Sequence, residues 1–139
     1  MSYSYISAAL RQQVYDRANS CCEYCLIPEM AVLFTHQIDH IIAEKHGGLT
    51  EDFNLALACV LCNKYKGSDI ASIDIETDEV VRLFHPRRDA WQDHFVLQAG
   101  KIEPLSAIGR VTVSLLQCNR AERISERDLL IQAGIIKNT

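Results

Sequence analysis

Two Cys-x-x-Cys pairs constrain this chain more than any other feature of its sequence. The first pair is Cys22 and Cys25, and the second is Cys59 and Cys62. Two such pairs can place four thiolates at the corners of a tetrahedron, which is the arrangement that zinc takes in closed structural sites. The segment between the pairs is longer than the roughly 15 to 20 residues of a simple zinc ribbon. The sequence therefore predicts one structural Zn²⁺ on these four residues, with further structure inserted between the two pairs.

Disulfides are the alternative use of the cysteines, because six of them in an extracellular chain would suggest a cross-linked framework. The pairing of four of them around a polar insert favours reduced, metal-bound thiolates. Cys21 stands one residue too far back to complete the first pair, so we expect it to be a packed thiol. An N-terminus without a basic stretch followed by an apolar run, and no apolar segment of about 20 residues, lead us to expect a cytoplasmic protein without a membrane contact.

The insert and the residues after it carry four polar or glycine features in a fixed order. They are the pair Asp39-His40, the pair Gly47-Gly48, Asn54, and Asn63 directly after the last cysteine. With the cysteine pairs around it, this order resembles the HNH endonucleases of the His-Me finger (ββα-metal) class over residues 20–70. That family has an Asp-His at a strand end, a glycine-rich loop, a central Asn, and a closing His or Asn at the start of a helix, often with two zinc knuckles.

The sequence departs from the family pattern in three places. Asn63 replaces a closing His, Ala43 stands where a proline is common, and the first cysteine is doubled as Cys21-Cys22. The first departure bears on which catalytic metal is preferred.

The resemblance implies an α+β fold. It consists of a ββα-metal (His-Me finger) core with zinc knuckles, an N-terminal helix and a C-terminal hairpin plus helices. Because 139 residues with 48% hydrophobic side chains are enough for one core, we expect a single HNH nuclease domain over 1–139. Its core covers about residues 20–70, its N-terminal helix 1–19, and its C-terminal extension 71–139.

Local patterns place the elements of this fold. Ser7 is a plausible N-cap for a helix that reaches Asn19, and Thr50 is a plausible cap for a short turn before Asn54. The alternation of apolar and polar residues predicts a strand within 31–42 that ends near His40. The remaining predictions are a loop over 45–49, a strand over 55–59, a helix from Cys62, a hairpin from strands at 73–75 and 79–84, a break at Pro86, a helix over 107–119, and a last helix capped by Ser125.

The resemblance also implies the chemistry of the site. A histidine with the usual pKa of about 6.5 is largely neutral near pH 7, so His40 can serve as the base that activates water. Adjacent residues of a strand point to opposite sides, so Asp39 can hold a metal while His40 faces the water. The oxygen ligands Asp39 and Asn63 favour Mg²⁺ or Mn²⁺. In the family the central Asn orients the imidazole, and Asn54 matches it.

Nucleic-acid contacts are expected from local cations, since the formal net charge of −4 gives no general attraction to phosphate. The candidates are Lys64, Lys66, Arg87 and Arg88. Whether other histidines join the site stays open, and the histidines concerned are His36, His46, His85 and His94.

Together these features predict an HNH endonuclease that hydrolyses phosphodiester bonds in double- or single-stranded DNA, leaving by family analogy a 5′-phosphate. The alternative is a catalytically silent, zinc-stabilised module that binds nucleic acid or protein. The sequence leaves open the target, the biological role and the oligomeric state.

Overall fold

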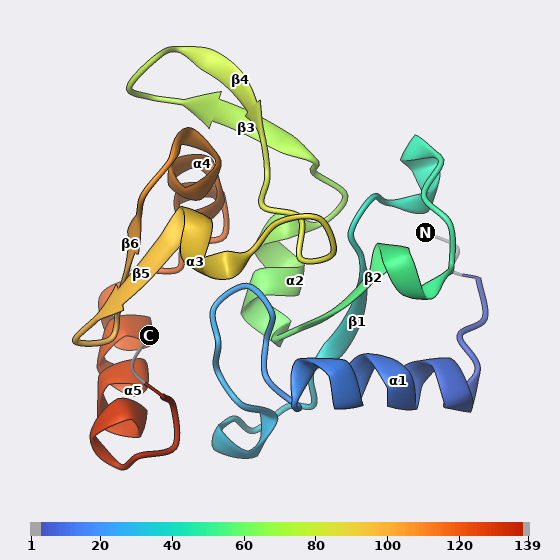
Figure 1. The fold of residues 1–139 in the computed structure, drawn as a ribbon, viewed down its shortest axis with the longest axis horizontal. Helices are drawn as coiled ribbons and strands as arrows, with labels where there is room; N and C mark the ends of the chain where they lie inside the picture. Colours follow the sequence, from blue (N-terminus) through green and yellow to red (C-terminus); the bar gives the residue numbers. More distant parts are fainter. Residues whose placement is uncertain (1–3, 138–139) are drawn as a thin grey trace. The chain divides into compact units, whose positions relative to one another are not determined.

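The computed structural model describes residues 4–137 and divides the chain into two compact units, Met1–Ile70 and Ala71–Thr139 (Figure 1). The α+β class expected from the sequence is confirmed. The single domain expected over 1–139 stays a prediction. Residues 1–3 and 138–139 lie outside the residues that the structure describes. Within the described residues, the helices are all too short or too polar to cross a membrane.

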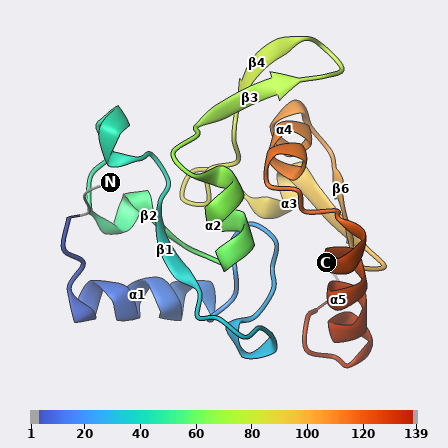
Figure 2. The same ribbon diagram turned by 180° about the vertical axis from the view of Figure 1, so that it is seen from behind.

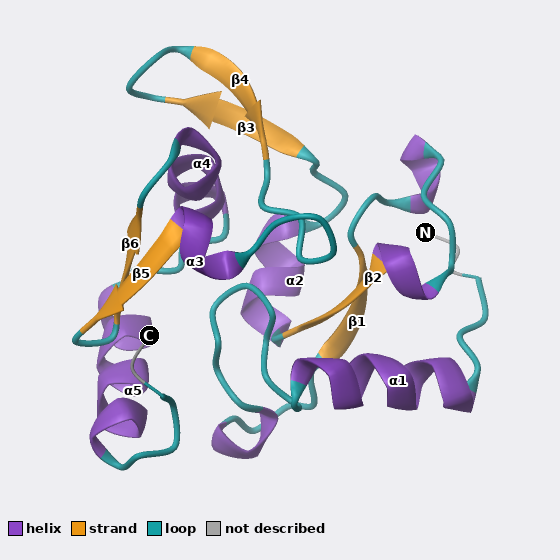
Figure 3. Ribbon diagram, in the orientation of Figure 1, coloured by secondary structure: helices purple, strands orange, loops and turns teal. Residues whose placement is uncertain are grey.

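The first unit contains the strand, loop, strand and helix order that defines a ββα core (Figure 3). Its two strands pair antiparallel, and the register sets Asp39 opposite Ala56 and His40 opposite Leu55. In chain order the elements are α1 (Ala8–Ala18), a 3₁₀ turn (Glu29–Ala31), β1 (Gln37–His40), a 3₁₀ turn (Glu44–His46), a third such turn (Asp52–Asn54), β2 (Leu55–Ala58) and α2 (Val60–Lys66).

Helix α1 supports the strand pair, and both ribbon views show it lying beside the strands (Figure 2). Val14 of α1 packs against Leu55 and Leu57 of β2, and all three side chains are fully buried. Burying an aliphatic side chain of this size contributes about 1.5 to 3 kcal/mol. Helix α1 begins where the sequence predicted, because the Ser7 hydroxyl accepts the backbone N–H of Leu10 at 3.1 Å. The core of this unit therefore fixes the strand that ends at His40.

Three boundaries in the first unit differ from the prediction. Strand β1 starts only at Gln37, because a 3₁₀ turn precedes it and the side chains of Leu33 and Phe34 are 96% and 70% exposed rather than paired in a sheet. Helix α2 starts at Val60, two residues before the predicted Cys62, because the sulfur of Cys59 caps it. Thr50 does not cap the turn before Asn54, since the residue at that position is Glu51.

The second unit holds two hairpins and three helices. The predicted hairpin is present, with Asp74 paired opposite Glu79. The second hairpin was not predicted, although Phe95 and Leu97 alternate with more exposed neighbours and its turn residues Ala99 and Gly100 both have positive φ, as such turns require. The elements are β3 (Ala71–Asp74), β4 (Glu79–Arg82), α3 (Trp91–His94), β5 (Phe95–Gln98), β6 (Lys101–Pro104), α4 (Ala107–Leu115) and α5 (Ala121–Gln132).

Helix α5 begins earlier than predicted and buries an arginine. Its N-cap is Arg120, so Ser125 lies inside the helix. The side chain of Leu129 is 67% exposed, whereas Arg127 is buried. The guanidinium of Arg127 donates to the carbonyl oxygens of Gly100 at 2.7 Å and Cys118 at 2.6 Å. Buried carbonyls that need donors explain why a cation takes the inner position.

Candidate functional site

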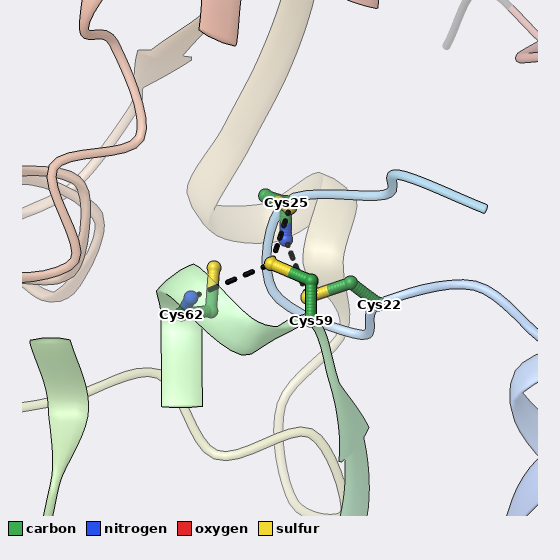
Figure 4. A group of neighbouring side chains, drawn as sticks. All are labelled: Cys22, Cys25, Cys59 and Cys62. Atoms are coloured by element: carbon green, nitrogen blue, oxygen red, sulfur yellow. Dashed lines mark hydrogen bonds between the residues drawn. The ribbon is translucent and has the colours of Figure 1, made fainter. Parts of the chain in front are cut away.

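The four predicted zinc ligands form one cluster in the first unit (Figure 4). Their sulfur atoms all lie within 4.8 Å of one another, and the sulfurs of Cys25 and Cys59 are 3.6 Å apart. Zinc with four sulfur ligands at about 2.3 Å needs sulfur separations of about 3.8 Å. Since all four residues are buried, the cluster fits a closed structural zinc site.

The backbone around each pair holds the sulfurs in place. The N–H of Cys25 donates to the sulfur of Cys22, and the N–H of Cys62 donates to the sulfur of Cys59, both at 3.4 Å. Burial raises the pKa of the Cys22 thiol, and a bound cation would reverse this effect because a coordinating thiol is deprotonated. Cys21 stays outside the cluster, with its sulfur 3.3 Å from the carbonyl oxygen of Asn19.

A pocket of about 880 Å³ opens beside the end of β1. It brings together three residues that the sequence assigned to the catalytic site, Asp39, His40 and Asn63. The other residues that line it are Ser4, Ile6, Arg11, Gln37, Ile38, Ala43, Glu44, Lys45, Gly67 and Ser68.

Asp39 is buried and held by two donors. The Tyr24 hydroxyl donates to its Oδ2 at 2.7 Å, and the ammonium of Lys66 lies 3.3 Å from Oδ1 and 3.2 Å from Oδ2. Burial raises the pKa of the Asp39 carboxyl, and the Lys66 charge acts in the opposite direction. A carboxylate offers about four lone-pair positions, so these contacts leave room for a further ligand bond.

The expectation that Lys66 contacts phosphate is wrong. Its side chain is only 1% exposed, and the ammonium also donates to the carbonyl oxygen of His40 at 3.2 Å. Lys66 therefore serves as the counter-charge of Asp39 and ties α2 to the end of β1. The neighbouring Lys64 is exposed, with its ammonium 5.8 Å from the centre of the Tyr65 ring.

The imidazole of His40 is positioned by residues that the sequence reasoning missed. Its Nε2 lies 2.9 Å from the hydroxyl oxygen of Thr50 and 3.3 Å from Oε1 of Glu44. Glu44 in turn accepts two hydrogen bonds from Ser4, one from the backbone N–H at 2.9 Å and one from the hydroxyl at 3.0 Å. The spacing of four residues between His40 and Glu44 was the signal in the sequence, but it carries little weight in a loop.

Among the described residues, Asn54 hydrogen-bonds to the backbone and not to the imidazole of His40, and its orienting role stays a prediction. Its Oδ1 accepts the N–H of Ile42, and its Nδ2 donates to the carbonyl oxygens of Ile42 and Leu49, all at 2.9 Å. Asn54 thus clamps the loop that follows His40. Gly48 is required in this loop, since a Cβ there would lie 1.7 Å from the Ile42 carbonyl oxygen.

Asn63 lies in the middle of α2 and lines the same pocket. Its Nδ2 donates to Oε1 of Gln37, and among the described residues no hydrogen bond is made to its Oδ1. The carboxylate of Asp39 and the amide oxygen of Asn63 are hard donors, and Mg²⁺ usually takes one or two carboxylates and keeps several waters. The pocket therefore fits a hard divalent cation by the chemistry of its donors.

The remaining candidates lie away from this pocket. His36 is buried, and its Nε2 donates to the carbonyl oxygen of Ile27. His46 is exposed and does not line the pocket.

The second unit holds the other cations and histidines named from the sequence. The backbone N–H of Arg87 donates to Nδ1 of His85 at 3.2 Å, and Arg88 is exposed. Nδ1 of His94 lies 2.7 Å from the hydroxyl of Ser106, the N-cap of α4. The two histidines thus have structural partners, and the nucleic-acid contacts of Arg87 and Arg88 stay predictions.

Comparison with known proteins gives one match. Residues 22–69 match the family model described as HNH endonuclease, and this segment begins at the first zinc ligand and ends three residues after Lys66. Comparisons with curated proteins and with solved structures found no match to the chain.

Proposed function

We propose that the chain is a metal-dependent endonuclease that hydrolyses phosphodiester bonds in DNA, and the match of residues 22–69 to the HNH endonuclease family model supports this proposal. The observation that carries this proposal is the pocket in which Asp39, His40 and Asn63 meet. Asp39 and His40 lie at the end of β1, and Asn63 lies in α2.

In the proposed reaction His40 takes a proton from water. A neutral imidazole is a suitable base near pH 7. With Nε2 engaged by Thr50 and Glu44, Nδ1 is the atom left to accept the proton. The electron pair of the broken O–H bond stays on the water oxygen, which attacks the phosphorus.

The resemblance implies a hard cation, Mg²⁺ or Mn²⁺, and Asp39 and Asn63 are the residues that would hold it. When bound, such an ion offsets the negative charge that develops on the phosphate and on the leaving oxygen. Lys66 and Tyr24 hold the Asp39 carboxylate in one orientation.

Contacts to the nucleic acid are proposed for the exposed cations around the pocket. Lys64 follows Asn63 directly, and Arg11 and Lys45 line the pocket. Each phosphate contact lowers log K by about 0.9 per unit of log salt concentration on B-DNA. Lys64→Ala should therefore weaken binding and flatten that dependence, whereas an unchanged slope would make Lys64 a solvated helix residue.

The deciding experiment incubates the zinc-loaded chain with supercoiled plasmid and with single-stranded DNA, each with Mg²⁺, Mn²⁺ or EDTA. We expect cleavage that EDTA stops and that His40→Ala lowers on the order of 10² to 10⁴-fold, with DNA binding retained. Asp39→Ala and Asn63→Ala should regain part of their activity at raised Mn²⁺, and His40→Ala should not.

Binding without cleavage under every condition would instead favour the silent zinc-stabilised module. Wild-type cleavage by His40→Ala would refute the role of the base.

A further inference from the structure

We propose that Glu44 is a positioning residue for His40, whose carboxylate keeps the imidazole hydrogen on Nε2 and leaves Nδ1 to accept the proton from water. This inference rests on the proposed function and adds to it a residue that neither the family pattern nor the sequence reasoning singled out.

The contacts of His40 Nε2 favour one tautomer of the imidazole. Nε2 of His40 faces two oxygens, Oγ1 of Thr50 at 2.9 Å and Oε1 of Glu44 at 3.3 Å. A carboxylate can only accept a hydrogen bond, whereas a hydroxyl can donate or accept. A bare Nε2 lone pair would therefore face the lone pairs of Glu44, so the tautomer with hydrogen on Nε2 is favoured.

Glu44 is itself held in place. Its 3₁₀ turn follows Ala43, and the two hydrogen bonds from Ser4 occupy both carboxylate oxygens. These hydrogen bonds, first from the Ser4 backbone and then from its hydroxyl, lower the pKa of Glu44. The carboxylate is therefore ionised at neutral pH.

Glu44 lies in the loop that the central asparagine holds. Asn54 clamps the backbone at Ile42 and Leu49, and Glu44 and the 3₁₀ turn lie between these two points. Asn54 therefore acts on His40 through the loop that presents Glu44. This explains how an asparagine that does not contact the imidazole can still matter for its orientation.

The chemical consequence appears when the proton is transferred. The water O–H bond breaks, the proton binds Nδ1, and the imidazole becomes a cation with hydrogen on both nitrogens. His40 is buried, with 8% of its side chain exposed, and an anion beside Nε2 favours the cation more strongly there than in water. Removing the carboxylate partner of a metal-ligating histidine typically lowers metal affinity or activity about 10- to 100-fold, and we expect a loss of the same order for the base His40.

The first test is kinetic. Glu44→Gln should lower kcat about 10- to 100-fold with KM little changed, and Glu44→Asp should recover part of the loss. In a His40→Ala background the same Glu44→Gln substitution should have no further effect. Glu51→Gln is the matched control, because this exposed residue of the same unit lies outside the pocket.

Two kinetic outcomes would overturn the inference. One is an equal loss from Glu44→Gln in both backgrounds, and the other is full recovery of Glu44→Gln at raised Mn²⁺, which would make Glu44 a metal ligand.

The second test reads the tautomer directly by long-range ¹H–¹⁵N NMR of the zinc-loaded full chain at about pH 8. We expect the Nε2–H tautomer in the wild type and a mixture in Glu44→Gln. An Nδ1–H wild type refutes the inference whether or not the protein cleaves DNA. A wild type with the Nε2–H tautomer that cleaves nothing refutes the proposed nuclease and leaves the positioning by Glu44 in place.

Discussion

Replacing Lys66 with methionine tests the interpretation of the buried ion pair. The substitution keeps an apolar stem of similar length but removes the ammonium, which makes contacts of 3.2 and 3.3 Å to Asp39 and 3.2 Å to the carbonyl oxygen of His40. The Asp39 carboxylate then stays buried with only the Tyr24 hydroxyl as a side-chain donor. Breaking a buried pair by removing one partner typically costs about 3 to 5 kcal/mol.

This loss is large compared with the roughly 5 to 15 kcal/mol that stabilises a typical domain. The assay is urea denaturation of the zinc-loaded chain at pH 7, followed by NMR signals of the Val14 and Leu57 methyl groups in the first unit. Lys64→Met is the control, because an exposed substitution should change stability by no more than about 0.5 kcal/mol.

A double variant separates the ion pair from simple packing. If the cost of Lys66→Met comes from the unpaired carboxylate, then adding Asp39→Asn should recover part of it, since a neutral amide needs no counter-charge. A Lys66→Met variant within about 1 kcal/mol of wild type, or a double variant whose losses simply add, would refute the reasoning.

Three further predictions concern other parts of the chain. Cys59→Ser should abolish stoichiometric zinc in metal analysis and unfold the first unit, because binding energy at such a site is folding energy; a well-folded, zinc-free variant would contradict the assignment. Gly48→Ala should lower the free energy of unfolding by at least about 3 kcal/mol, at the upper end of overpacking, because its Cβ would lie 1.7 Å from a backbone oxygen. Gly47→Ala should lower it by only about 1 to 2 kcal/mol, because Gly47 has φ +88° but open space around it. Equal losses in urea denaturation would argue against the loop geometry. In the second unit, Arg110 lowers the pKa of Asp74 to about 2 from the usual 3.8. The stability that this pair contributes is therefore present above about pH 4 and is lost as the pH falls through about 2. A carboxyl NMR titration should show a higher pKa of Asp74 in Arg110→Met, and an unchanged pKa would contradict the pairing.

The spacing and order of residues predicted those parts of the site that depend on residue type rather than on how distant segments pack. Four cysteines in two pairs specify a tetrahedral cluster almost regardless of the fold around them. The register of β1 and the position of Asn63 directly after the last cysteine then bring Asp39 and Asn63 to one pocket with His40.

The sequence did not reveal which charged side chains lie inside. Lys66 and Arg127 are charged residues, which usually lie at the surface, yet each donates to buried oxygens that need a hydrogen-bond donor. Such a requirement arises only after distant segments pack, so no local pattern reports it. Glu44 and Thr50 could not be predicted for the same reason, because their contacts with His40 depend on the conformation of the loop that Asn54 holds.

Cys59 has two roles that together link zinc binding to the folding of the chain. Its sulfur belongs to the cluster of four cysteines and also caps α2, a helix of seven residues. A helix this short does not persist alone in water, and joining Cys25 to Cys59 closes a long loop at an entropic cost of about 3 to 4 kcal/mol. With zinc bound, one event closes that loop and starts the helix that carries Asn63 and Lys66. A cell short of zinc would therefore accumulate an unfolded, protease-sensitive chain, and zinc supply would set the number of folded molecules.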